Sequence, residues 1–261
     1  MITLVRAAAA AFYVSMRLRV VSSFALLAWL FFPFIFAVVG LYVFARPGSA
    51  NPQLVYGVLG GGLIGYFGIA YLDGGLSIQD ERWNGTLEQV FAVPTPLWVI
   101  LLGKVCGSIL WGMLSFVPTI AVAYFGFHAL VPHLDAGRFA VSFAVLTFSM
   151  FAIALTLAPL YALWRWALPM FNGFEFGFCI LCGFMFPVTL LPEWAQGAAG
   201  VLAPSWATRA LYASTTNGGS HDFLAWWLAA VGLSFIYLAG ALLLYRLVDS
   251  RARMSGELAL A

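Results

Sequence analysis

Long apolar runs, separated by short polar or proline- and glycine-rich stretches, fill most of the chain. A helix needs roughly 20 mostly apolar residues to cross the hydrocarbon core of a bilayer, and about six runs meet or approach that length. No stretch outside them is long enough for a separate soluble domain, so residues 1–261 are predicted to form one all-α polytopic membrane domain. The predicted spans are 22–44, 54–78, 97–125, 139–163, 174–190 and 223–248.

The composition points the same way. Hydrophobic residues make up 63% of the chain and charged residues 8%, against roughly 25% charged in soluble proteins. Twelve Lys and Arg with ten Asp and Glu cannot cover the surface of a soluble globule of this size, which excludes a soluble enzyme. The formal net charge of +2 gives no reason to expect nucleic acid as a partner.

Residues 1–21 precede the first span and predict a helix that lies in the plane of the membrane interface. Arg6, Tyr13 and Arg17 recur at i, i+7 and i+11, while apolar residues such as Leu4 fall on another face. This two-faced pattern is typical of helices that rest between lipid headgroups and acyl chains.

The basic residues predict the orientation, because cytoplasmic segments of membrane proteins carry an excess of Lys and Arg. With both termini in the cytoplasm, the outer segments hold only Arg46, Arg138 and Arg209. The opposite orientation would invert that ratio, so we expect a multi-pass protein of the inner (plasma) membrane with cytoplasmic N and C termini. The basic residues on or near the cytoplasmic side are then Arg6, Arg17, Arg19, Arg82, Lys104, Arg165, Arg246, Arg251 and Arg253.

The segment 187–212 follows the fifth span and is rich in proline. It contains an apolar run, 194–203, that is too short to cross a bilayer. We expect it to dip into the outer leaflet and return, which requires protein or a water-filled cavity around the broken backbone. An ordinary extracellular amphipathic loop is the alternative. The residues expected to form a gate there are Pro187, Pro192, Trp194, Gly197 and Pro204.

A polar island, 79–94, lies between the second and third spans on the predicted cytoplasmic side. Read as a helix, it places Trp83, Leu87, Val90 and Phe91 on one apolar face. The segment is either an interfacial helix resting on lipid or a surface that binds a partner. Clustering of charge favours a partner, since a chain with few charges gathers four of them in nine residues, at Asp80, Glu81, Arg82 and Glu88.

Two motifs in this order resemble a known family, the ABC-2 type transporter permeases. The first matches its cytoplasmic E-x-x-x-G-T-L-E-x…P pattern, through Glu81, Gly85, Thr86, Leu87, Glu88 and Pro94. The second is similar to the family's fifth span and re-entrant hairpin, through Gly183 to Pro187, Leu191, Pro192, Trp194, Ala203 and Pro204. Trp83 and Asn84 depart from the further charge that many relatives carry there.

The resemblance implies a permease subunit that pairs with a second copy or a sibling permease and with two ATP-binding cassette ATPase subunits. These would grip a coupling helix formed by Asp80, Glu81, Arg82, Trp83, Gly85, Thr86, Leu87 and Glu88. The chain has no G-x-x-x-x-G-K-[ST] motif, so ATP and Mg are expected to be used by the partner, with no cofactor or metal bound here and no enzyme activity of its own.

The implied cargo is an amphipathic or hydrophobic small molecule, drug-like or lipid-like, moved outward. Export of a free or lipid-linked saccharide is the nearest alternative within the family. An ion-driven secondary transporter is an alternative from another class, although no acid is obvious near the middle of a span. A lipid-active membrane enzyme is a third, for which His128, His133 and Asp135 are the only candidate cluster.

Three charged residues fall inside or beside apolar segments: Asp73, Lys104 and Glu175. Such residues are functional candidates because an unpaired charge in a bilayer is costly. All three map near the cytoplasmic ends of their spans, so they can reach the interface or pair with one another. Structural pairing, a role in gating and contact with cargo remain open.

Small residues suggest close helix packing and little redox chemistry. Gly57, Gly61, Gly65 and Gly68 recur every three or four residues in the second span, which lets another helix approach closely. The third span repeats the pattern with Gly103 and Gly107. Cys179 and Cys182 form a C-x-x-C pair inside an apolar run, where packing is the simpler role.

Overall fold

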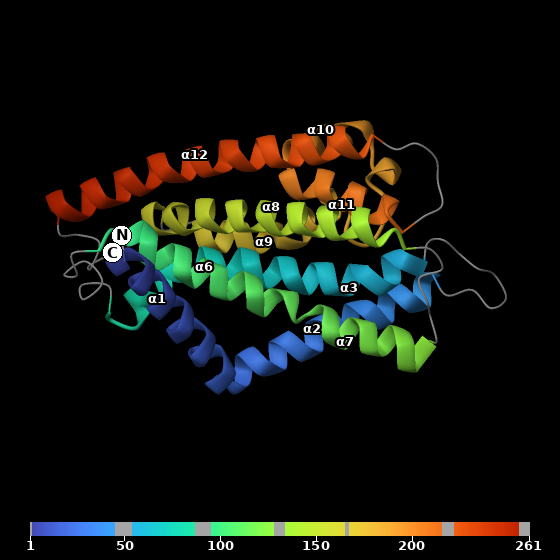
Figure 1. Ribbon diagram of the computed structural model, residues 1–261, viewed down its shortest axis with the longest axis horizontal. Helices are drawn as coiled ribbons and strands as arrows, with labels where there is room; N and C mark the ends of the chain where they lie inside the picture. The colour runs from blue at the N-terminus through green and yellow to red at the C-terminus, as the bar shows by residue number, and fades with distance from the viewer. Residues whose placement is uncertain are drawn as a thin grey trace.

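The computed structural model describes residues 2–44, 54–86, 95–127, 134–164, 167–215 and 222–255, and within these ranges it contains helices and no strand. The long helices run along one axis of the molecule (Figure 1). The elements are α1 (Ile2–Val21), α2 (Ser23–Phe44), α3 (Leu54–Gly68) with the π-helical η1 (Ile69–Asp73), α4 (Ser77–Trp83), α6 (Leu97–Met113), α7 (Phe116–Ala121) with η2 (Val122–Gly126), α8 (Ala136–Leu163), α9 (Ala167–Leu181), η3 (Val188–Leu190), α10 (Glu193–Val201), α11 (Ala203–Ala213) and α12 (Phe223–Ser255).

Four helical stretches in the described part of the chain are long and apolar enough to cross a membrane, which supports an all-α membrane protein. They are Leu54–Asp73, Leu97–Gly126, Ala136–Leu163 and Phe223–Val248, at the places of the second, third, fourth and sixth predicted spans. The first predicted span corresponds to α2, of which Leu30–Phe44 is a shorter apolar helix.

The fifth predicted span, 174–190, has different bounds in the structure, because α9 is shorter and begins earlier, covering Ala167–Leu181. The last residue of α9 is Leu181, and Gly183 follows with a φ of +73°. The amides of Gly183 and Phe184 bond back to the carbonyls of Ile180 and Cys179, at 3.0 and 3.3 Å. This pair of bonds is the Schellman C-cap, which favours glycine at the left-handed position.

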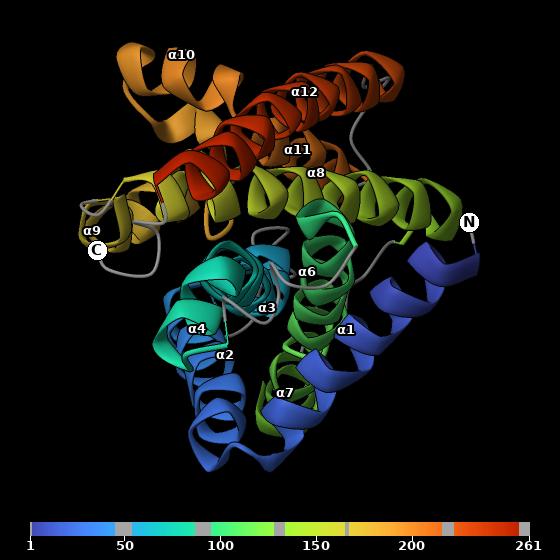
Figure 2. The same ribbon diagram turned by 90° about the vertical axis from the view of Figure 1, so that its left-hand side faces the viewer.

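Glycines set two of the close helix contacts, as the pattern of small residues predicts. A Cβ placed on Gly61 of α3 would lie 2.6 Å from the backbone nitrogen of Ala37 in α2. A Cβ on Gly103 of α6 would lie 2.2 Å from the carbonyl oxygen of Ala8 in α1. Only glycine allows these backbones to meet, so α1 packs along α6 as well as facing outward (Figure 2).

The two ends of the bundle carry different elements. At one end lie α4, the start of α1 and α6, and the end of α12; we call this the α4 end (Figure 1). At the opposite end, the α10 end, lie α10 and the starts of α3, α8 and α12 (Figure 1). The first and last described helices therefore have their outer termini at the same end, the arrangement expected if both termini lie on one side of a membrane.

The segment 187–212 forms short helices that turn back into the bundle. Helix α10 is nine residues long, the chain breaks at Leu202, and α11 packs against α8 and α12 on its way back. The hydroxyl of Tyr237 donates to the carbonyl of Val201 at 2.5 Å. Tyr237 is 14 residues into α12, so at 1.5 Å per residue the break lies about 21 Å along the bundle from the start of that helix.

Candidate functional site

Helix α4 forms from the start of the polar island and stops early. Its last residue is Trp83, and Gly85 follows with a φ of +67°. The amides of Gly85 and Thr86 bond to the carbonyls of Arg82 and Glu81, at 3.1 and 2.9 Å, which is again a Schellman cap. The prediction of one helix over 79–94 is therefore wrong at this point: the glycine ends it, and 87–94, with Leu87 and Glu88, lie outside the described residues.

Glu81 makes the side-chain polar contacts that join α4 to α6. Its carboxylate forms an ion pair with the Lys104 ammonium of α6 and accepts a hydrogen bond from the Thr86 hydroxyl. Lys104 also donates to the carbonyl of Ser77 at 3.3 Å. The Lys104 and Glu81 side chains are 15% and 18% exposed, so the pair is largely removed from solvent and fixes α4 to α6.

A second ion pair lies one turn further along α6. The Arg19 guanidinium of α1 contacts the Asp73 carboxylate of η1 at 3.2 Å, and it donates to Ser108 of α6 at 2.7 Å and to the carbonyl of Ser15 at 3.3 Å. Arg19 thus joins α1, η1 and α6. Ser108 follows Lys104 by four residues and donates to its carbonyl at 3.3 Å, so the two pairs occupy adjacent turns. We call Arg19, Asp73, Glu81 and Lys104 the ion cluster.

The ion cluster shows which of the charges within spans have ion-pair partners, and gating and cargo contact stay predictions. Asp73 and Lys104 are paired, but with Arg19 and Glu81 and not with each other. Glu175 lies on α9 and takes no part; its Oε1 would lie 3.0 Å from a Cβ on Gly68. Arg19 was missed as a cluster member because the predicted interfacial helix gave no reason to turn it inward.

The acidic groups of α4 differ in their ease of ionisation. Burial raises the pKa of Asp80 to about 6, although the Lys104 charge opposes the shift. Burial also acts on Glu81, but hydrogen bonds from Lys104 and Thr86 and the Lys104 charge outweigh it and lower the pKa of that carboxyl. Glu81 is therefore ionised at neutral pH, as the ion pair requires.

The last turn of helix α4 also presents an exposed apolar side chain. The Trp83 side chain is 61% exposed at the last helical turn, and Asn84 and Gly85 beside it are exposed. Arg82 donates to Gln79 across one turn at 3.5 Å. Helix α4 thus combines a largely solvent-shielded ionic attachment to α6 with an exposed tryptophan at its last turn.

The residues expected to form a gate divide into two groups at the opposite end. Pro187 precedes η3, Pro192 caps α10, and Pro204 lies in the first turn of α11, so the prolines mark where short elements start. Trp194 is 77% exposed and a Cβ on Gly197 would have no atom within 4 Å, so these two are not packed against this chain.

The other candidate chemistry finds little geometric support. Cys179 and Cys182 are buried thiols without a disulfide, and no three His, Cys, Asp or Glu side chains of the described ranges gather as metal ligands would. Asp135 caps α8 by accepting from the Arg138 amide at 3.1 Å. His128 and His133 lie outside the described residues.

The sequence was compared with protein-family models and with curated proteins. No protein-family model matches the chain, and no curated protein matches it.

Proposed function

We propose that the chain is the permease subunit of an ATP-driven exporter, in which separate ATPase subunits act on the α4 end. The observation that carries the proposal is the ionic attachment of α4 to α6 through Glu81 and Lys104. A force on α4 would pass to α6 by this pair and to α1 and η1 by the neighbouring Arg19–Asp73 pair. Ion pairs between rigid helices are suitable elements for such rigid-body coupling.

The residues of the proposed coupling motif have separable roles in this geometry. Glu81 holds α4 to α6, Gly85 supplies the left-handed turn that ends the helix, and Thr86 bonds back to Glu81. The Trp83 side chain does not serve to hold α4 in the bundle in this way, because most of it is exposed. It is therefore the described residue of the motif best placed to contact a partner.

The ATPase subunits would bind ATP and Mg, and two permease chains would enclose the path. Cargo would be an amphipathic or hydrophobic small molecule that enters from the membrane and leaves at the α10 end, past the α10–α11 pair. Of that pair, α11 is the sheltered member, since it packs against α8 and α12.

Co-purification with a single substitution tests the proposal. Trp83→Ala should reduce recovery of the ATPase about tenfold or more, since exposed aromatic anchors dominate many interfaces. Trp98→Ala is the matched control, because Trp98 is 45% exposed at the start of α6 at the same end. Equal recovery in the wild type and both variants would exclude Trp83 as the contact; transport by the purified wild type on an ion gradient without ATP would replace the proposal with a secondary transporter.

A further inference from the structure

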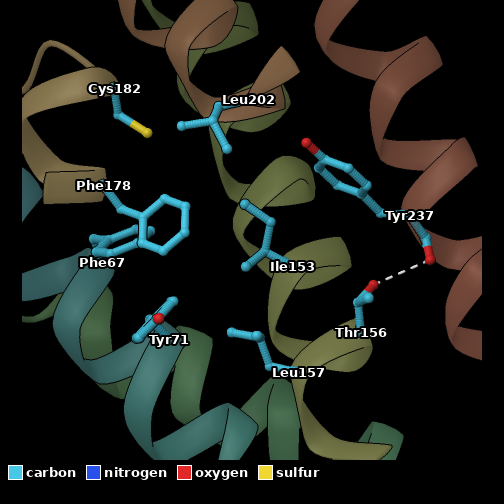
Figure 3. Close-up of a pocket in the computed structure, with 9 residues that line it drawn as sticks. All are labelled: Phe67, Tyr71, Ile153, Thr156, Leu157, Phe178, Cys182, Leu202 and Tyr237. Atoms are coloured by element: carbon cyan, nitrogen blue, oxygen red, sulfur yellow. Dashed lines mark hydrogen bonds between the residues drawn. The ribbon is translucent and has the colours of Figure 1, made fainter. Parts of the chain in front are cut away.

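Two pockets of opposite character lie next to each other, the first inside the bundle and the second towards the α10 end. The first, of about 140 Å³, is lined entirely by apolar surface and lies among α3, α8, α9, α12 and the break between α10 and α11 (Figure 3). The second, of about 310 Å³, lies under α11. Cys182 lines both, so the two pockets share a wall. The first is lined by Phe67, Tyr71, Ile153, Thr156, Leu157, Phe178, Cys182, Leu202 and Tyr237.

Two of the hydroxyl groups around the first pocket, those of Thr156 and Tyr237, are already bonded within the chain. Thr156 donates to the carbonyl of Ala152 at 2.8 Å and to that of Tyr237 at 3.0 Å, the latter drawn in Figure 3. Tyr237 donates to Val201. The pocket therefore offers no polar group to a ligand and suits an apolar one; a cavity of about 150 Å³ with such walls is large enough for benzene.

The second pocket contains polar groups that lack partners. Arg209 and Thr208 of α11 line it. The Nε of Arg209 and the Oγ1 of Thr208 are buried and have no hydrogen-bond partner among the described residues. Thr208 is 1% exposed, so its hydroxyl cannot turn to bulk water for a partner. Buried polar atoms without partners are uncommon in folded proteins and call for an explanation.

Charge determines what could complete this pocket. Arg209 stacks on the Trp206 ring at 4.7 Å, which holds the guanidinium in place, and no described residue supplies a counterion for its charge. None of the described residues that line the pocket is acidic. A phosphate, sulfonate or carboxylate would accept hydrogen bonds from both Arg209 and Thr208, and guanidinium matches such planar or tetrahedral anions well.

We propose that the two pockets form one site for an anionic amphiphile. Its charged group lies against Arg209 and Thr208, and its apolar part passes Cys182 to lie among Phe67, Phe178 and Ile153. Binding at this site needs no ATPase and no second chain, whereas its use as the cargo site depends on the proposed function. The two can therefore fail separately.

The test is titration of the purified chain, in nanodiscs of zwitterionic lipid, with three matched probes: hexyl phosphate, hexan-1-ol and inorganic phosphate. Hexyl phosphate should bind at least tenfold more tightly than either of the others, after subtraction of partitioning into empty nanodiscs. Equal binding of hexan-1-ol would show that the charge is not recognised. Equal binding of inorganic phosphate would show an anion site that does not use the apolar pocket. Either result, or no binding, overturns the proposal.

Substitutions locate the site. Arg209→Gln should weaken hexyl phosphate binding about tenfold or more, while Arg138→Gln, at an exposed arginine of the same end, should not change it. Thr208→Val should weaken binding severalfold without lowering the ligand-free midpoint of thermal unfolding, because the hydroxyl has no internal bond to lose. Ile153→Phe, which fills the apolar pocket, should weaken the binding of hexyl phosphate and leave the binding of inorganic phosphate unchanged. Unchanged hexyl phosphate binding in Arg209→Gln and Ile153→Phe would contradict the assignment.

Discussion

Replacement of Lys104 by methionine isolates the contribution of the ion cluster to stability. Methionine keeps the length and apolar stem of lysine but removes the ammonium that contacts Glu81 and the carbonyl of Ser77. Both charged side chains are less than one-fifth exposed, at 15% and 18%. Removing one member of a buried ion pair leaves the other charge unpaired and costs about 3–5 kcal/mol; partial exposure places this pair near 3 kcal/mol.

The assay is thermal unfolding of the purified protein in detergent, where a loss of that size lowers the midpoint by roughly 6–12 °C. Arg6→Met is the matched control, since Arg6 is exposed at the same end and should change the midpoint little. A double-mutant cycle with Glu81→Gln should give a coupling energy of about 1–3 kcal/mol. A coupling energy near zero would refute the argument that the pair holds α4 to α6.

The pH dependence of the same variants gives an independent check. Burial of Glu81 raises the pKa of its carboxyl, but the hydrogen bonds from Lys104 and Thr86 outweigh burial and lower that pKa below its ordinary value of 4.5. A group whose pKa is lowered by folding stabilises the fold above its ordinary pKa, and that stabilisation disappears as pH falls through the folded value. The difference in the unfolding midpoint between wild type and Lys104→Met should therefore be largest near neutral pH and shrink below about pH 4.5.

Three further predictions concern packing, turn geometry and orientation. Gly103→Ala should destabilise the protein by about 1–3 kcal/mol in thermal unfolding, because its Cβ would overlap the Ala8 carbonyl, whereas Gly177→Ala, with open space around the Cβ, should not. Gly85→Ala should cost about 1 kcal/mol and Gly85→Asn less, measured in the same way, because asparagine tolerates the left-handed conformation better; equal costs would argue against the cap. A cysteine at Asp222 should react with an impermeant thiol reagent added to intact cells and one at Asn84 should not; the reverse labelling would invert the orientation. Asn51 and Asn217, which the sequence also predicts to be labelled from outside, lie outside the described residues.

The sequence was sufficient for the class of fold and for most long helices, because membrane-length apolar runs leave few alternatives. It was insufficient where local turns compete with apolarity. The run from Phe174 to Leu190 is apolar almost throughout, yet Gly183 ends the helix by adopting a positive φ. Gly85 does the same in the polar island. In both cases the pattern of apolar residues continues past the glycine and therefore predicts a longer helix than the backbone forms.

The candidate site was only partly predictable, since pairing depends on how helices cross. Asp73, Glu81 and Lys104 were recognisable as unusual charges in an apolar chain. Their partners were not, because Arg19 lies 54 residues before Asp73 and reaches it through the contact of α1 with α6. The sequence identifies Arg209 only as a basic residue of a predicted outer segment. That no described residue supplies its counterion in the pocket is a property of the fold and not of its neighbours in sequence.

The central claim, that a separate ATPase acts on this chain through α4, can be tested most directly by photocrosslinking in cells. A photoreactive amino acid replaces Trp83 in one variant and Asp222, at the opposite end, in another. The account predicts that the first variant crosslinks to a polypeptide with a phosphate-binding G-x-x-x-x-G-K-[ST] motif and that the second does not. Crosslinking to such a polypeptide from position 222 alone, or from neither position, would contradict it.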